Sequence, residues 1–218
     1  MQHQQQSIED LTDANRCIRD LVALSAAPAL WVGRDSLQLA TGLADVLYGI
    51  LRPMLVYVGI NDGANAVKEV VRDAHGCRRY ADAREISRLF APWFKISEIG
   101  ESRVILNPIG PGMVRAIALP IGLHGVFGHL AVVSQLVHFP NKIDRLLLGV
   151  AASQAATAVQ SQRAVLAASA SKVQMQRLKD AVEKLLARDP SDPETLRARL
   201  HDLLNESGIG EDEATPAT

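Results

Sequence analysis

Apolar residues recur every three or four positions along the first part of the chain, between Ser7 and Pro28. The series also contains two polar members, and it consists of Ile8, Leu11, Asn15, Ile18, Val22 and Ser25. A stripe this narrow is typical of a helix that pairs with another helix rather than one buried in a large core. We therefore predict that residues 1–28 form a dimerisation or signalling helix, ended by Pro28.

The pattern changes twice over the next forty or so residues. Helical spacing from Asp35 onward, closed by Pro53, predicts a second helix. Residues 54–60 (MLVYVGI) then form a short apolar run rich in β-forming residues, followed by the turn sequence Asn61-Asp62-Gly63. Residues 66–72 can return beside this run, so we expect an antiparallel hairpin.

Shorter segments follow, and their alternation of apolar and polar residues favours strands. The pattern predicts a loop, a short helix and three strands, in the order 73–80, 81–91, 102–107, 113–121 and 126–136. Helices at both ends of a run of short strands predict an α+β fold with an antiparallel sheet.

A long helix is predicted from Asn141, which can cap it with Asp144 in the first turn. No proline interrupts the segment up to Asp189, and Gly149 is its weak point. Apolar residues among charged ones predict a weak or stuttered coiled coil over 163–189. Beyond it we expect a short amphipathic helix over 190–206 and a disordered acidic tail over 207–218.

Composition narrows the range of functions. The 218 residues are 48% hydrophobic and 22% charged, with a net charge of −1 and only 4% aromatic residues. This balance gives no field to attract nucleic acid and few rings to stack on its bases. Apolar runs are much shorter than a membrane span of ~20 residues, and two cysteines make no disulfide framework. We expect a cytoplasmic protein that binds neither nucleic acid nor membrane.

Several stretches resemble GAF domains of bacterial sensor proteins, the type associated with PAS and histidine-kinase segments. The resemblance covers roughly residues 20–162, and its most specific part joins paired late strands to a Phe-Pro turn and a helix. These stretches are Leu119–Gly122, Gly125–Val133, Phe139-Pro140, Leu146–Ala152 and Gln154–Ala156. The resemblance implies a GAF-like sensory domain over 29–162, with a central antiparallel sheet, helices packed on one side and a small-molecule pocket on the other. It identifies neither a ligand nor a cofactor.

Three residues are candidates for ligand binding. Cys77 could attach a chromophore or act in redox chemistry, but its order His75-Gly76-Cys77 reverses the Cys-His of bilin-binding GAF domains, and an ordinary loop thiol explains it as well. Arg103 and Arg115 could bind an anion from strand positions. They could equally lie on the solvated face of the sheet, because alternation alone does not choose the face.

The sequence contains no motif for metal binding, phosphotransfer or catalysis. None of the histidines His75, His124, His129 and His138 forms a spaced pair with a cysteine or carboxylate, so we predict no metal site. His201 lacks the context of a phosphoacceptor, and residues 107–112 lack the Lys-Ser/Thr of a phosphate-binding loop. No nucleophile-base set or carboxylate pair is visible, and we predict no catalytic residues.

We therefore expect a non-catalytic GAF-type sensory or regulatory module that acts as a homodimer through its terminal helices. Ligand or partner events would pass through those helices to a separate kinase or other signalling protein. An alternative is a protein-interaction adaptor with an unoccupied GAF pocket, which docks through residues 196–204. A third hypothesis is a methionine-sulfoxide-reducing enzyme of the GAF type. That chemistry needs several positioned cysteines, and Cys17 and Cys77 lie in unsuited segments.

Overall fold

The computed structural model describes residues 2–31, 33–61, 63, 66–74, 76–79, 81–94 and 100–186. It divides into two compact units, Met1–Arg163 and Ala164–Thr218. The segments predicted as an amphipathic helix and an acidic tail, 190–206 and 207–218, lie outside the described residues. No helix in the described ranges is long and apolar enough to span a bilayer.

The first unit is built on one antiparallel sheet. Its six strands in the described part of the chain follow the order β3-β2-β1-β6-β5-β4. Their bounds are β1 Leu55–Ile60, β2 Lys68–Asp73, β3 Gly76–Arg79, β4 Ser102–Leu106, β5 Met113–Ile121 and β6 Gly128–Ser134. The first and last strands of the domain pair at its centre, where Gly59 of β1 lies opposite both Glu69 of β2 and His129 of β6.

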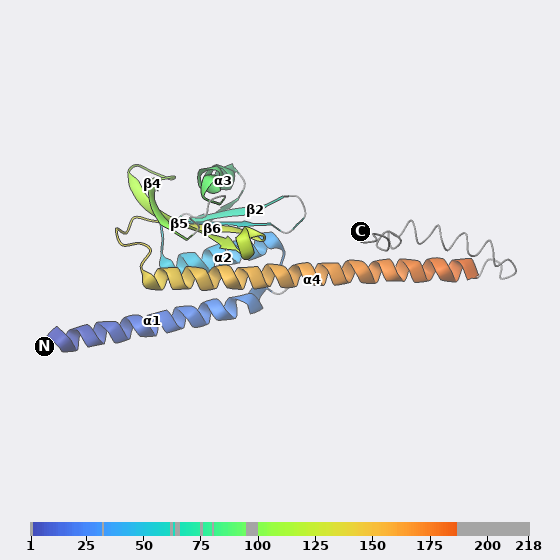
Figure 1. Ribbon diagram of the computed structural model, residues 1–218, viewed down its shortest axis with the longest axis horizontal. Coiled ribbons are helices and arrows are strands. Elements are labelled where there is room, and N and C mark those ends of the chain that lie inside the picture. The colour runs from blue at the N-terminus through green and yellow to red at the C-terminus, as the bar shows by residue number, and fades with distance from the viewer. Residues whose placement is uncertain are drawn as a thin grey trace, which may run out of the picture. The chain divides into compact units, whose positions relative to one another are not determined.

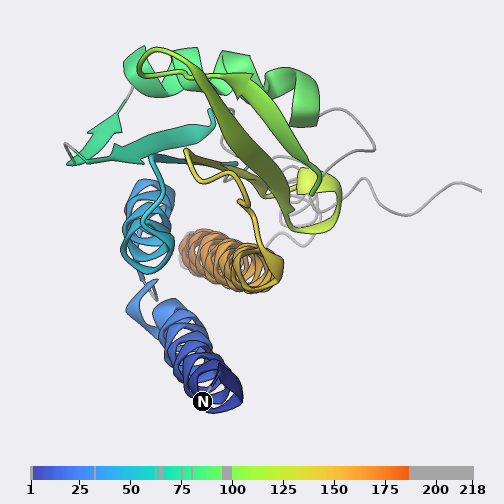
Figure 2. The ribbon, with the colours of Figure 1, turned by 90° about the vertical axis from the view of Figure 1, so that its left-hand side faces the viewer.

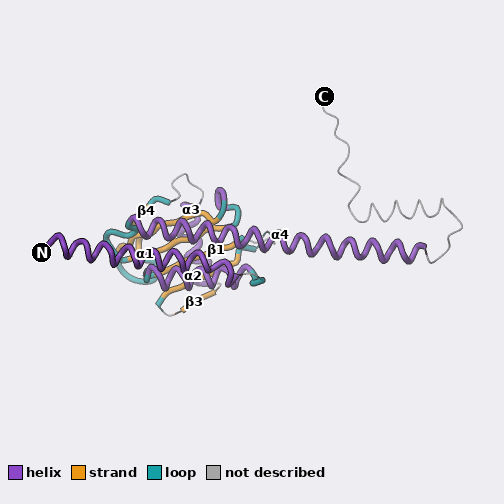
Figure 3. The backbone as a smooth tube through the Cα atoms, turned by 90° about the horizontal axis from the view of Figure 1, so that it is seen from below, coloured by secondary structure: helices purple, strands orange, loops and turns teal. Residues whose placement is uncertain are grey.

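Helices cover both faces of this sheet (Figure 1). On one face lie α2 (Ser36–Leu51) and the first part of α4 (Lys142–Leu186), and the end of α1 (Gln2–Trp31) packs beneath them. Figure 2 shows these three helices end-on below the sheet, and Figure 3 shows them from below, across the strands. The opposite face carries α3 (Ala81–Phe94). The predicted α+β class with an antiparallel sheet is confirmed.

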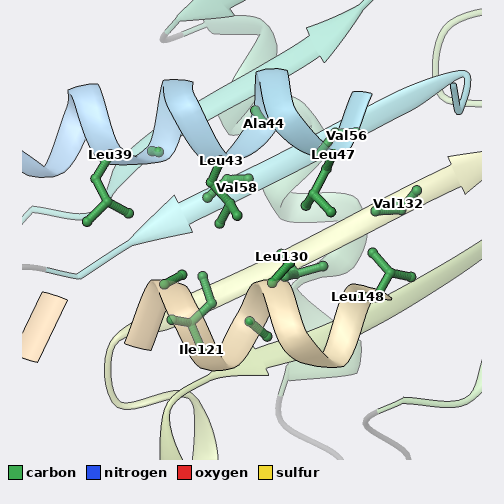
Figure 4. Packing of buried hydrophobic residues seen from close by; sticks show 14 of the residues in the cluster. Leu39, Leu43, Ala44, Leu47, Val56, Val58, Ile121, Leu130, Val132 and Leu148 are labelled. Atoms are coloured by element: carbon green, nitrogen blue, oxygen red, sulfur yellow. The ribbon is translucent and has the colours of Figure 1, made fainter. Parts of the chain in front are cut away.

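The larger core lies between the sheet and the pair α2 and α4. Leu39, Leu43 and Leu47 of α2 point toward the sheet beside Leu148 of α4 (Figure 4). They meet the face of β1 and β6 that carries the even-numbered side chains, where Val58, Leu130 and Val132 are fully buried. The four leucines are buried as well, with at most 1% of any of them exposed. Burial of each such side chain contributes roughly 1.5–3 kcal/mol, so this layer fixes the two helices on the sheet.

Capping residues place the helix starts. Asp35 and Gln38 form a capping box at α2, in which the Asp35 carboxylate accepts from the Gln38 amide at 2.7 Å. Asn141 and Asp144 do the same at α4, with reciprocal hydrogen bonds of 2.8 and 2.9 Å. The cap predicted for the long helix is confirmed, and α4 runs unbroken for 45 residues through Gly149.

Three boundaries differ from those predicted. Helix α1 continues through Pro28 to Trp31, because burial of Ala27 and Trp31 offsets the backbone hydrogen bond that a proline removes. Helix α3 likewise contains Pro92 and ends at Phe94. The expected loop over 73–80 contains strand β3, because residues 76–79 return beside β2 and give that strand a second partner.

Candidate functional site

A buried tyrosine is the centre of the polar groups on the α3 face. Tyr57 of β1 is only 2% exposed, and its hydroxyl lies 3.0 Å from Oε1 of Glu69 and 3.2 Å from Oγ of Ser87. With a single proton, the phenol donates to the carboxylate and accepts from the serine hydroxyl. Burial raises the pKa of Tyr57 well above its ordinary value, and the Glu69 charge adds to this effect. The phenol therefore stays protonated.

Gly59 makes room for this hydroxyl. A Cβ at Gly59 would stand 2.5 Å from the Tyr57 oxygen, because residues two apart on a strand share a face. A side chain here would push the phenol away from Glu69 in β2 and Ser87 in α3. The glycine thus lets one hydroxyl tie β1 to both neighbouring elements.

His129 stands on the same face, opposite Gly59 in the register of β1 and β6. Its ring stacks on Phe94 of α3, with centroids 4.2 Å apart and planes inclined by 18°. The Nε2 atom lies against Gly125 and has no hydrogen-bond partner among the described residues. Burial lowers the pKa of His129, so the ring is held in its neutral form.

Aromatic rings join the tyrosine to the histidine. Phe94 is also nearly parallel to Tyr57, with centroids 6.0 Å apart, and Phe90 meets the edge of Trp93 at 5.3 Å. The α3 face therefore combines flat apolar surfaces with a protonated phenol and a carboxylate. Groups of this kind bind planar ligands by stacking and hydrogen bonding where they line an open pocket. None of them is an activated nucleophile.

The predicted site residues are not brought together. Arg103 of β4 lies on the α3 face, with its guanidinium 5.5 Å from the ring centroid of Trp93. It pairs with Ala116, whose neighbour Arg115 points to the opposite face of the sheet. Cys77 belongs to β3, at the other edge from β4, and its side chain lies outside the described residues.

The polar groups that do converge were missed by the sequence analysis. Tyr57 stands inside an apolar run, while Glu69 and Ser87 follow it by 12 and 30 positions. The one available signal was the polar tip of Tyr57 in a buried strand, since a buried phenol usually finds a hydrogen-bond partner. No cluster of three or more metal-ligating side chains occurs within the described ranges.

No protein-family model matches this chain, and no curated protein matches it. Solved structures do resemble it. The GAF domain of a sensor histidine kinase from Pseudomonas syringae pv. tomato is 15% identical, with a TM-score of 0.49 over 74% of this chain and 98% of that one. The GAF domain of a phosphoenolpyruvate-protein phosphotransferase from Coxiella burnetii is 12% identical, with a TM-score of 0.46 over 71% and 98%.

An enzyme stands among these structures as well. The free methionine-R-sulfoxide reductase from Neisseria meningitidis, solved with its substrate, is 16% identical, with a TM-score of 0.42 over 65% of this chain and 89% of that one. In fold, the chain is similar to GAF domains of bacterial proteins. The likeness is one of fold alone and does not extend to ligand, activity or partner.

Proposed function

We propose that the chain is a non-catalytic sensory or regulatory module of the GAF type that acts as a homodimer in signal transduction. The observation that carries this proposal is that α1 has apolar residues on two opposite sides. Leu24, Ala27 and Trp31 bury one side of the helix in the domain. The opposite side carries the apolar stripe found in the sequence, and the domain leaves that stripe uncovered.

The stripe has the spacing of a helix-pairing seam. Leu11, Ile18 and Val22 are separated by seven and four residues and are 64%, 58% and 63% exposed. Exposed apolar residues in such a row mark an interaction surface rather than a core. A second copy of the same helix is the partner with matching chemistry, because the polar Asn15 within the seam can pair with its own counterpart.

Sedimentation analysis tests the dimer. We expect a homodimer at micromolar concentration, and an Ile18→Asp variant is expected to shift it to monomer while circular dichroism stays unchanged. The matched control is Leu123→Asp, which places the same charge at an exposed leucine outside the stripe. A wild-type protein that is strictly monomeric at these concentrations would refute the proposal.

The ligand region of this module is the α3 face. The Tyr57–Glu69–Ser87 hydrogen bonds and the His129–Phe94 stack supply both polar and flat apolar contacts there. Native mass spectrometry of the purified protein tests whether a small molecule is carried. A bound species that survives Tyr57→Phe unchanged would place the ligand elsewhere.

An adaptor is the second candidate, and a different surface favours it. Val104 and Leu106 of β4 and Met113 of β5 are exposed at the edge of the sheet. An apolar edge of this kind suits a protein partner such as a separate kinase. Partner capture that is lost with Leu106→Asp but retained with Ile18→Asp would favour the adaptor over the homodimeric sensor.

The absence of catalysis is also part of the proposal, and a direct assay tests it. Cys17 lies half-buried in α1, on the other side of the sheet from the α3 face. Reduction of free methionine sulfoxide that disappears in Cys77→Ser would overturn the non-catalytic assignment.

A further inference from the structure

One arginine ties the long helix to the centre of the sheet. Arg163 of α4 donates from Nη2 to the carbonyl oxygen of Asn61, which follows β1, at 2.7 Å. Its guanidinium also lies over the ring of Phe127, 4.8 Å from the centroid. Asn61 and Phe127 are themselves joined, because the Asn61 amide donates to the Phe127 carbonyl at 2.9 Å. The arginine therefore contacts one hydrogen-bonded unit at the end of the β1–β6 pair.

The position of this contact along α4 is distinctive. Val159 is fully buried in the core, and Arg163 is half-buried. Every residue from 164 to 177 is exposed. Arg163 is thus the last partly buried residue of α4 before this exposed run.

Asn61 and Phe127 are also close in sequence to two residues of the candidate site. Asn61 stands two residues after Gly59, and Phe127 stands two residues before His129. Gly59 and His129 lie opposite each other on the α3 face. A Cβ at Gly128 would overlap the carbonyl oxygen of Gly59, so the backbones of the two strands lie in close contact here. The paired backbones of β1 and β6 therefore connect His129 to both Asn61 and Phe127.

We infer that Arg163 is a positioning residue that couples the α3 face to the exposed part of α4. This inference rests on the proposed sensory function and names the route by which the site reaches the helix. The Nε atom of Arg163 is buried and has no hydrogen-bond partner in the described part of the chain. The contacts that hold the guanidinium are therefore those to the Asn61 carbonyl and the Phe127 ring.

The strength of the contact is sufficient for this role. A hydrogen bond from a charged donor changes an equilibrium by roughly 10- to 100-fold. The neighbouring Gln162 accepts from the Ser36 hydroxyl at 3.3 Å, which ties the same turn of α4 to the start of α2. Because this second contact remains, we expect an Arg163→Gln variant to keep its fold and to lose only the link to the sheet.

A double-mutant cycle on the full chain tests the coupling. Amide hydrogen exchange is followed by NMR at residues 164–171 in the wild type, His129→Ala, Arg163→Gln and the double variant. We expect His129→Ala to speed exchange at these amides about threefold or more in the wild-type background. In the Arg163→Gln background we expect His129→Ala to cause no further change in exchange at these amides.

Two controls separate coupling from general loosening. Arg145 of the same helix also donates to a backbone carbonyl, that of Gly100, at 2.8 Å. Arg145→Gln should therefore leave the effect of His129→Ala at 164–171 intact. Amides of α2 between Leu39 and Leu47 serve as the internal reference, because a purely structural role would speed exchange there equally. Arg163→Lys, which keeps a donor but loses the flat guanidinium over Phe127, should restore part of the coupling.

Three outcomes would overturn the inference: His129→Ala leaves exchange at 164–171 unchanged, its effect persists in the Arg163→Gln background, or exchange in α2 changes equally. Sedimentation of the same samples reports the homodimer separately. Exchange can be measured in a monomer too, so failure of the proposed dimer and failure of the coupling are distinguishable.

Discussion

Gly128 is the position at which the smallest substitution should do the most damage. It opens β6 with φ +130, a conformation that residues with a side chain rarely adopt. A Cβ there would overlap the Gly59 carbonyl oxygen and crowd the Ile60 Cα, which is 3.1 Å away. Both neighbours are backbone atoms of the paired strand, so no side-chain rotation can relieve the overlap.

The cost of Gly128→Ala can be worked from these contacts. Backbone strain of this kind costs about 1–3 kcal/mol. Displacing β6 from β1 loses one or two ladder hydrogen bonds at about 1 kcal/mol each. We therefore expect the free energy of unfolding to fall by about 2–5 kcal/mol, measured by urea unfolding at one fixed protein concentration.

The same chemical change in α4 provides the control. Gly149 is exposed in the helix, and a Cβ there would meet nothing within 4 Å. Gly149→Ala should raise the free energy of unfolding by about 1 kcal/mol, since alanine favours a helix more than glycine does. The reasoning is refuted if Gly128→Ala unfolds within 1 kcal/mol of the wild type.

Three further predictions concern α1, α4 and His129. Trp31→Ala should cost about 3–5 kcal/mol in urea unfolding, because the ring is 5% exposed and Gly42 packs against it. Asp144→Ala removes one half of the capping box with Asn141 and should cost about 1 kcal/mol by the same measurement. Burial lowers the folded pKa of His129, so the unfolded chain binds more protons. Stability should therefore decrease as pH falls below about 6.5, and His129→Gln should reduce that decrease.

Local signals predicted the parts of the fold that local chemistry decides. The apolar run before Asn61 and the reciprocal pair Asn141 and Asp144 each act within a few residues, and both features are present. Pro28 shows where such signals fail. Its effect on the backbone is local, but the burial of Trp31 that carries the helix past it depends on distant parts of the chain.

The candidate site could not be predicted from the sequence, for a related reason. Alternation along a strand separates two faces but does not say which one a helix will cover. Arg103 and Arg115 illustrate this, because the register sets Arg103 opposite Ala116 and leaves the two guanidinium groups on opposite faces. Tyr57 and His129 meet on one face only because β1 and β6, distant in sequence, are neighbours in the sheet.

The stripe on α1 was predicted from sequence. The free energy gained by burying it decides whether it can hold a dimer together. Burial of one Leu, Ile or Val side chain contributes roughly 1.5–3 kcal/mol, so the three exposed members from each of two helices contribute on the order of 10 kcal/mol. Association itself costs an estimated 4–15 kcal/mol. The free energy gained by burying the α1 seam is therefore close to the cost of association. A dimer that is stable at micromolar concentration would need a second seam. The exposed Leu166 and Val173 of α4, which are seven residues apart and share one face of the helix, supply apolar surface for one.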